Sequence, residues 1–288
     1  MHPNSAYNLQ LDTLITNALA EDIGDGDHST LSCIDAGAKG LAILKIKEAG
    51  ILAGVTVAEK VFLHVQKTAV INKFKADGNT MQPGDIAFEV EAYIQTILTC
   101  ERLVLNCMQR MCGIATLTKT YTDKLKNYKT KLLDTRKTTP NFRVLEKEAV
   151  RIGGGVNHRF GLYDMIMLKD NHIDYCGGIE QAISKAWQYV QDKKPGLQIE
   201  VETRNLEDVK KVMNTGKVNR IMLDNFTPQQ IVDALKIING QSETEASGGI
   251  NYDNLEQYAD TGVDFVSSGA IIHQAKSLDL SLKAEIKK

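Results

Sequence analysis

Six short, mostly apolar segments, each ending in a polar or charged residue, recur through the second half of the chain. They cover residues 131–134, 165–169, 198–202, 220–224, 244–247 and 264–268. Their ends lie 21 to 35 residues apart with helical patterns between them, a spacing typical of βα units and a parallel sheet. Because barrel enzymes carry their chemistry at polar strand ends, closure into a barrel is favoured over an open sheet. Six strands are fewer than the eight, in about 250 residues, of a full barrel, so we expect a smaller or incomplete one.

The chain before residue 113 has a mixed α and β pattern. Helical spacing covers residues 11–19, 55–65 and 96–111, and strand patterns cover residues 40–47, 69–74 and 86–93. The last of these helices is apolar over most of its circumference, except for a narrow stripe of Arg102, Asn106 and Gln109. A buried helix with such a stripe needs a polar partner for it. We expect a first domain of residues 1–112 and a barrel of residues 113–274.

Composition excludes several classes of protein. The formal net charge of −2 argues against a nucleic-acid binder that relies on a strong overall positive field. The five cysteines are odd in number and contain no Cys-x-x-Cys pair, which disfavours a disulfide framework or a zinc ribbon. Residues 9–19 are amphipathic rather than a signal peptide, and no apolar run reaches the length of a membrane span. A cytoplasmic location is expected.

Positively charged residues concentrate in three motifs near strand ends. The motifs are residues 134–140, with Arg136 and Lys137; residues 153–159, with three glycines, His158 and Arg159; and residues 169–172, with Lys169 ending a strand. Guanidinium groups hold carboxylates in a bidentate fashion, and lysine acts as a point charge for phosphate. Together with Arg102, the motifs predict a ligand that carries several negative charges.

Each motif alone has an ordinary structural explanation. Adjacent cations in a loop are usually solvated, a run of glycines often marks only a flexible loop, and Lys169 can extend to a solvent-exposed rim. His172 is interpreted as a structural histidine rather than a catalytic one. The coincidence of cations at two strand ends, with a glycine-rich cationic loop between them, favours a functional role.

Two carboxylates, Glu202 and Asp224, end consecutive strands and should lie side by side at one barrel face. They can hold Mg²⁺, directly or through water, and stabilise a cationic transition state. A structural ion network with Lys169 is an alternative that is compatible with this role. Glu200 ranks lower, because we expect a regular strand to turn it away from Glu202.

The last two βα loops contain similar serine-glycine motifs. Ser247, Gly248 and Gly249 follow one strand, and Ser268 and Gly269 follow the next. Backbone N–H groups at helix starts bind phosphate, and these two loops form the usual phosphate site of barrels. His273, four residues after Gly269, is a further candidate donor to the phosphate.

As an ordered set, these motifs resemble those of the quinolinate phosphoribosyltransferases over essentially the whole chain. The resemblance rests on residues 21–24, Glu101, Arg102 and Asn106, and residues 134–138, 153–159, 169–172, 200–202, 223–225, 247–250 and 268–269. One departure is Asn141, where the family has glycine. Asparagine tolerates a left-handed backbone better than most residues.

The resemblance implies an α/β fold in which an α/β sandwich precedes an incomplete, six- to seven-stranded β/α barrel. A C-terminal tail, residues 275–288, would return to the first domain. It also implies a homodimer in which Arg102 enters the active site of the neighbouring subunit.

The resemblance further implies transfer of a phosphoribosyl group from phosphoribosyl pyrophosphate to quinolinate. The products would be nicotinate mononucleotide, pyrophosphate and CO₂, without an organic cofactor. The implied quinolinate ligands are Arg102, Arg136, His158, Arg159 and Lys169. Lys137 would lie near the pyrophosphate, Glu202 and Asp224 would face the ribose, and Mg²⁺ would bind with phosphoribosyl pyrophosphate. The 5′-phosphate would bind at Ser247, Gly248, Gly249, Ser268, Gly269 and His273.

Two alternatives remain open from the residues. A phosphoribosyltransferase for nicotinate, which has one carboxylate, needs fewer cations. A non-catalytic barrel that binds sugar phosphates needs the phosphate loops but neither Glu202 nor Asp224.

Overall fold

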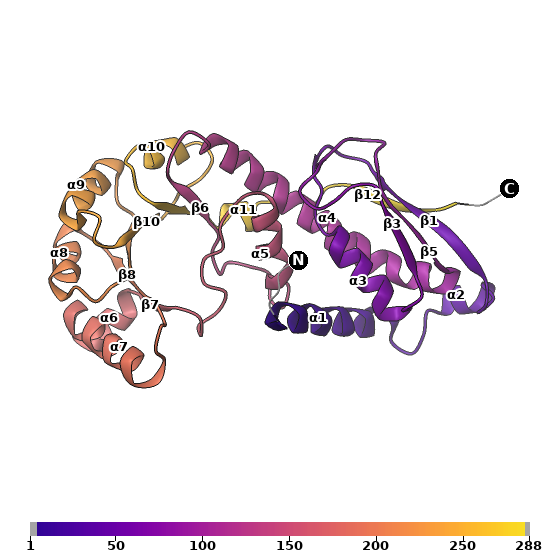
Figure 1. Ribbon diagram of the computed structural model, residues 1–288, viewed down its shortest axis with the longest axis horizontal. Coiled ribbons are helices and arrows are strands. Elements are labelled where there is room, and N and C mark those ends of the chain that lie inside the picture. Colours follow the sequence, from indigo (N-terminus) through magenta and orange to yellow (C-terminus); the bar gives the residue numbers. More distant parts are fainter. Residues whose placement is uncertain (1–4, 286–288) are drawn as a thin grey trace. The chain divides into compact units, whose positions relative to one another are not determined.

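The computed structural model describes residues 5–285 of the chain and divides it into two compact units (Figure 1). The first comprises the chain up to Lys119, Thr138–Gly154, and the chain from Ile271 onward; the second comprises Thr120–Lys137 and Gly155–Ala270. Residues 1–4 of the expected first domain and residues 286–288 of the expected tail lie outside the described residues.

The first unit is built on a four-stranded antiparallel sheet in the order β12-β1-β5-β3. The strands are β1 (Lys39–Ile46), β3 (Val70–Lys73), β5 (Ile86–Tyr93) and β12 (Leu280–Glu285). β12 pairs with β1 in the register Leu44 to Leu282, so the C-terminal segment joins this sheet. The α3 helix (Val55–Val65) buries an apolar face that includes Phe62, whose ring meets the Phe88 ring of β5 edge-on at a centroid distance of 6.4 Å.

Further elements complete the first unit. They are α1 (Ser5–Ile23), α2 (His28–Cys33), the paired short strands β2 (Gly50–Ile51) and β4 (Thr80–Met81), α5 (Arg143–Ile152) and most of α4 (Ile94–Lys124). The sequence did not predict α2, β2, β4 or β12. Two-residue strands, a six-residue helix and a six-residue edge strand are too short to show a clear periodicity.

The helix that we expected to end near residue 111 is α4, which is 31 residues long and ends at Lys124. Gly113, where the pattern changes, lies inside this helix. A Cβ there would overlap the backbone carbonyl of Lys276, so the glycine permits a close crossing of the chain instead of ending the helix. The last turn packs in the second unit, where the Tyr121 ring meets Tyr252 and Lys124 Nζ donates to the Tyr252 carbonyl at 2.7 Å. The expected boundary after residue 112 therefore falls within α4.

The second unit is an incomplete β/α barrel of six parallel strands in the order β6-β11-β10-β9-β8-β7. The strands are β6 (Lys131–Leu133), β7 (Ile166–Leu168), β8 (Ile199–Thr203), β9 (Arg220–Asp224), β10 (Glu243–Ser247) and β11 (Phe265–Ser267), as the six apolar segments predict. Four helices lie on the outside of the curved sheet in Figure 1: α7 (Ile179–Lys193), α8 (Leu206–Thr215), α9 (Pro228–Ile238) and α10 (Leu255–Ala259). Two short helices follow β7 and β11. They are α6 (Asp170–Cys176) and α11 (Ala270–His273), of which all but Ala270 belongs to the first unit.

The sheet is open between β6 and β7, because neither strand pairs with the other. Val156 forms a parallel bridge to Leu133 of β6 and extends the sheet at this edge. The glycine-rich loop that begins at Gly153 thus reaches the open edge, immediately before its charged residues.

Candidate functional site

The carboxyl ends of β7, β8 and β9 bring together three of the expected site residues. Lys169 directly follows β7, and its Nζ lies 2.7 Å from Oε2 of the buried Glu202 on β8. Asp224 ends β9, and its pKa is raised by burial and then by the charge of Glu202, while Lys169 acts in the opposite direction. The Ser247 side chain of β10 acts on the pKa of Asp224 in the same direction as Lys169. Two carboxylates and one ammonium group therefore share a small volume at one end of the barrel.

Arg136 and Arg159 lie close enough for their charges to interact. Burial, and then the charge of Arg136, lower the pKa of the Arg159 guanidinium. Arg136 Nε is buried and has no hydrogen-bond partner among the described residues. A pair of half-buried guanidinium groups with an unused donor is well suited to bind an anion.

The loop that carries Arg159 is held by Asp134, at the end of β6. Asp134 is buried, and its carboxylate accepts from the His158 N–H at 2.8 Å and from Asn157 Nδ2 at 2.7 Å. From the sequence, we predicted only that Asp134 ends a strand. Its signal was a carboxylate placed between an apolar strand and a cationic loop.

The His158 ring is 5% exposed and is turned toward two buried glutamates. Nε2 lies 2.9 Å from Glu200 Oε2 and 3.2 Å from Glu245 Oε2, and Nδ1 accepts the Arg159 N–H at 2.6 Å. Burial lowers the pKa of His158, and the charges of both glutamates raise it. Because Nδ1 accepts the Arg159 N–H, a second ring proton has no place on Nδ1, and the ring is neutral with its proton on Nε2. Burial, followed by the charge of Glu245, raises the pKa of Glu200 to about 7.

The expectation that Glu200 points away from Glu202 is wrong, because residues two apart on a strand share a face. On β8, Glu200 contacts His158, and Glu202, nearer the carboxyl end of the strand, contacts Lys169. Glu245 was not predicted as a site residue. Its signal was a charged residue in the middle of a short segment that the pattern makes a buried strand.

The loop after β10 requires glycine at position 248. Gly248 has φ +97°, and a Cβ would overlap the side chain of Asn225, which also has a positive φ of 58°. Gly249 has φ +63° but open space around the Cβ position. The Ser268 hydroxyl, from the next loop, donates to the Ile250 carbonyl at 2.8 Å and links the two loops.

Other expected residues occupy more exposed positions. Lys137 is exposed, and its N–H donates to Thr135 Oγ1. Asn141 has φ +60°, the left-handed conformation that asparagine tolerates. His172 Nδ1 accepts the Lys169 N–H at 3.1 Å, and its structural role stays a prediction. His273 is exposed at the end of α11.

Comparisons with known proteins identify the family. Two models match: the N-terminal domain of quinolinate phosphoribosyl transferase over residues 27–112, and its C-terminal domain over residues 114–283. The chain belongs to the quinolinate phosphoribosyltransferase family. The nicotinate-nucleotide pyrophosphorylase (carboxylating) of Oryza sativa subsp. japonica is 41% identical over 99% of this chain and 79% of the relative.

Solved structures agree with this family. NadC from Streptococcus pyogenes has 41% identity and a TM-score of 0.88, covering 96% of both chains. The nicotinate-nucleotide pyrophosphorylase from Francisella tularensis has 38% identity and a TM-score of 0.87, covering 96% of this chain and 97% of the other. The α/β sandwich and the incomplete barrel expected for a quinolinate phosphoribosyltransferase are confirmed.

The residues of the α4 polar stripe have two kinds of environment. Gln109 Nε2 donates to the Leu280 carbonyl of β12 at 3.2 Å, so its partner lies in the same unit. Arg102 and Asn106 are exposed, as is Leu98 one turn earlier. These three residues, four apart, share one face of the helix.

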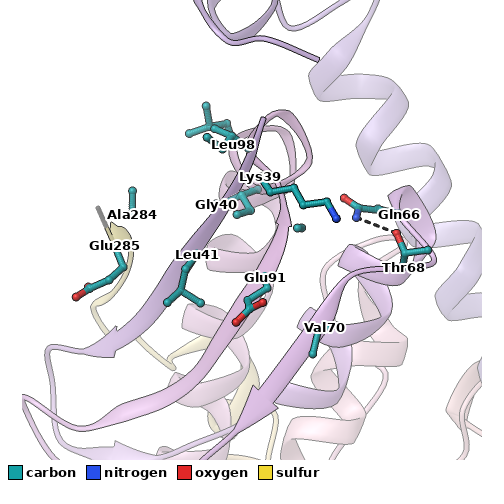
Figure 2. A pocket seen from close by; sticks show the side chains of 13 residues that line it. Lys39, Gly40, Leu41, Gln66, Thr68, Val70, Glu91, Leu98, Ala284 and Glu285 are labelled. Carbon is teal, nitrogen blue, oxygen red and sulfur yellow. Dashed lines mark hydrogen bonds between the residues drawn. The ribbon is translucent and has the colours of Figure 1, made fainter. Parts of the chain in front are cut away.

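A groove in the first unit lies beside this helix face (Figure 2). It has a volume of about 560 Å³ and is lined from β1, β3, β5, β12 and the start of α4, including Lys39, Gln66 and Leu98. None of its lining residues is an expected site residue.

None of the helices within residues 5–285 is long and apolar enough to span a bilayer.

Proposed function

We propose that the cations at the barrel strand ends bind the two carboxylates of quinolinate. The chain catalyses the reaction of its family, in which quinolinate accepts a phosphoribosyl group and loses CO₂ to give nicotinate mononucleotide for NAD biosynthesis. The observation that carries the site proposal is the pair of Arg136, with its unpartnered buried Nε, and Arg159, whose pKa is lowered by that neighbour. Glu200 and Asp164 offset part of this repulsion, and a bound dianion would relieve the rest.

Phosphoribosyl pyrophosphate would bind at the carboxyl ends of β10 and β11. The 5′-phosphate would be held by the loops of Ser247, Gly248 and Gly249 and of Ser268 and Gly269, with His273 as a further donor. The open space at Gly249, where a Cβ would meet no atom within 4 Å, supports this role, because it leaves the backbone of the loop accessible to a phosphate. Lys137, exposed on the loop after β6, would approach the pyrophosphate.

Glu202 and Asp224 would face the ribose. Their oxygen donors suit Mg²⁺, and the pKa of Asp224 is raised by burial and then by the charge of Glu202, effects that a nearby cation would offset. Two carboxylates leave several coordination positions for phosphate oxygens and water, which fits an ion carried by phosphoribosyl pyrophosphate. When bound, Mg²⁺ supplies positive charge that neutralises the departing pyrophosphate.

The chemistry then depends on position and charge. Arg136, Arg159 and Lys169 orient the ring nitrogen of quinolinate toward the anomeric carbon. Glu202 and Asp224 stabilise the positive charge that grows there as the bond to pyrophosphate breaks. The cationic ring nitrogen formed by the attack stabilises the electron pair left on the adjacent ring carbon when its carboxylate leaves as CO₂. A proton from water then bonds to that carbon and gives nicotinate mononucleotide. No protein nucleophile is required.

We also propose a homodimer in which Arg102 completes the quinolinate site of the other subunit. Arg102 is exposed on a helix whose other faces are largely buried, and it follows the exposed Leu98 on the same face. A cation so placed is available to a second copy of the chain. A cytoplasmic location stays a prediction; the relative from rice is named chloroplastic.

The test is Arg102→Ala. Because Arg102 is exposed, the variant should fold with an unchanged melting temperature, while KM for quinolinate rises by about a hundredfold through loss of a charge-assisted contact. Pyrophosphate and CO₂ release are measured together with quinolinate and then with nicotinate. Normal affinity for quinolinate in the variant contradicts the assignment, and equal turnover of nicotinate without CO₂ favours the alternative substrate.

A further inference from the structure

A cluster of ionisable side chains lies inside the barrel, apart from the groups that face the substrates. Glu200 of β8 and Glu245 of β10 are both fully buried, and the His158 ring lies between them at 2.9 and 3.2 Å. Arg220 of β9 places Nη1 3.6 Å from Glu245. Buried carboxylates are costly, and apolar residues of similar size are often at least as stable in such positions. The cluster therefore calls for a role other than simple stability.

The hydrogen bonds around His158 connect this cluster to Arg159. Since Nδ1 accepts the Arg159 N–H at 2.6 Å, a proton on Nε2 points toward the two glutamates. The His158 N–H in turn donates to Asp134 at 2.8 Å. The backbone on both sides of the His158 Cα is thus fixed, and the ring is the link between Arg159 and the barrel interior.

We propose that Glu200 and Glu245 are positioning residues for quinolinate binding, which act by holding the His158 ring so that its Nδ1 fixes the backbone of Arg159. His158 then serves as an anchor of the loop, not as a ligand of the substrate carboxylate through its ring. The inference rests on the proposed contact of Arg159 with quinolinate.

The three side chains also have the composition of a metal site, with ligand atoms within 4.8 Å of one another. Two observations favour the positioning role. Arg220 already supplies positive charge to Glu245, and the Nδ1 contact with Arg159 directs the proton of a neutral ring to Nε2, where a metal would have to bind.

The experiment compares Glu200→Met, which removes the acceptor of the Nε2 proton, with Glu200→Gln, which keeps one. Glu200→Met should raise KM for quinolinate about ten- to a hundredfold through misplacement of Arg159, with KM for phosphoribosyl pyrophosphate changed less than about twofold. Glu200→Gln should restore most of the affinity. Glu245→Met provides a second variant should Glu200→Met fail to fold.

Two controls separate positioning from a general loss of structure. Glu207→Met, on α8 after β8, where the exposed Glu207 pairs with Lys210 at 2.6 Å, should leave both KM values unchanged. In an Arg159→Ala background, Glu200→Met should have no further effect on KM for quinolinate.

Several outcomes overturn the inference. It fails if Glu200→Met changes both KM values equally, if its effect persists in full without Arg159, or if the purified protein holds a stoichiometric metal that Glu200→Gln loses. If Arg159→Ala itself leaves KM for quinolinate unchanged, the proposed role of Arg159 fails instead, and the two failures are distinguished.

Discussion

Replacing Arg136 by methionine should change stability and quinolinate affinity in opposite directions. In the free protein, Arg136 has a buried Nε without a partner among the described residues and lies near a second guanidinium. An unsatisfied buried donor costs about 1–3 kcal/mol. Because Arg136 is only half-buried, we take the lower end, about 1 kcal/mol, which raises the melting temperature of a protein of this size by about 2–4 °C.

Quinolinate binding should weaken in the same variant. A bidentate contact between a guanidinium and a carboxylate contains two charge-assisted hydrogen bonds, each worth about 1.5–3 kcal/mol. Loss of about 3 kcal/mol corresponds to a roughly 100-fold weaker Kd. Calorimetric titration with quinolinate measures the affinity, and thermal unfolding without ligand measures the stability.

Arg151→Met is the matched control. Arg151 is exposed and pairs with Glu148 at 2.6 Å, so its removal should cost less than about 1 kcal/mol and leave the affinity unchanged. The reasoning is refuted if Arg136→Met melts at a lower temperature than the wild type and still binds quinolinate normally.

The remaining predictions concern the phosphate loop and the buried cluster. Gly248→Ala should abolish measurable affinity for phosphoribosyl pyrophosphate and lower the melting temperature, because the Cβ overlaps Asn225 as well as straining a positive φ. Gly249→Ala meets no protein atom and should destabilise by only about 1–2 kcal/mol; equal melting temperatures for the two variants would contradict the close approach. The raised pKa of Glu200, about 7, means that the folded state binds this proton more tightly than the unfolded chain. The resulting stabilisation is present below the unfolded pKa of 4.5 and is lost as pH rises through about 7. The free energy of unfolding of Glu200→Gln should therefore rise, relative to that of the wild type, by on the order of 3 kcal/mol between pH 5 and pH 8. Thermal unfolding across that range measures the difference, and parallel pH profiles would refute the assignment.

The sequence by itself determined the barrel strands. Each of the six segments has a periodicity, an apolar content and a polar end that depend only on neighbours in the chain, and β9 has the predicted bounds. Parallel strands align their carboxyl ends, so the meeting of Lys169, Glu202 and Asp224 also followed from sequence order. Asn141 could be assigned a left-handed backbone for the same local reason.

Only the tertiary structure decided the features that depend on distant contacts. Gly113 resembled a boundary, yet the crossing of Lys276 makes it an interior residue of α4. The ring of His158 points to Glu200 and Glu245, residues 42 and 87 positions away in the chain, which no local pattern relates to it. A local pattern records which residues prefer a strand, a turn or the surface. Which buried charges meet is decided by the closure of the sheet, which brings β8 and β10 around one histidine.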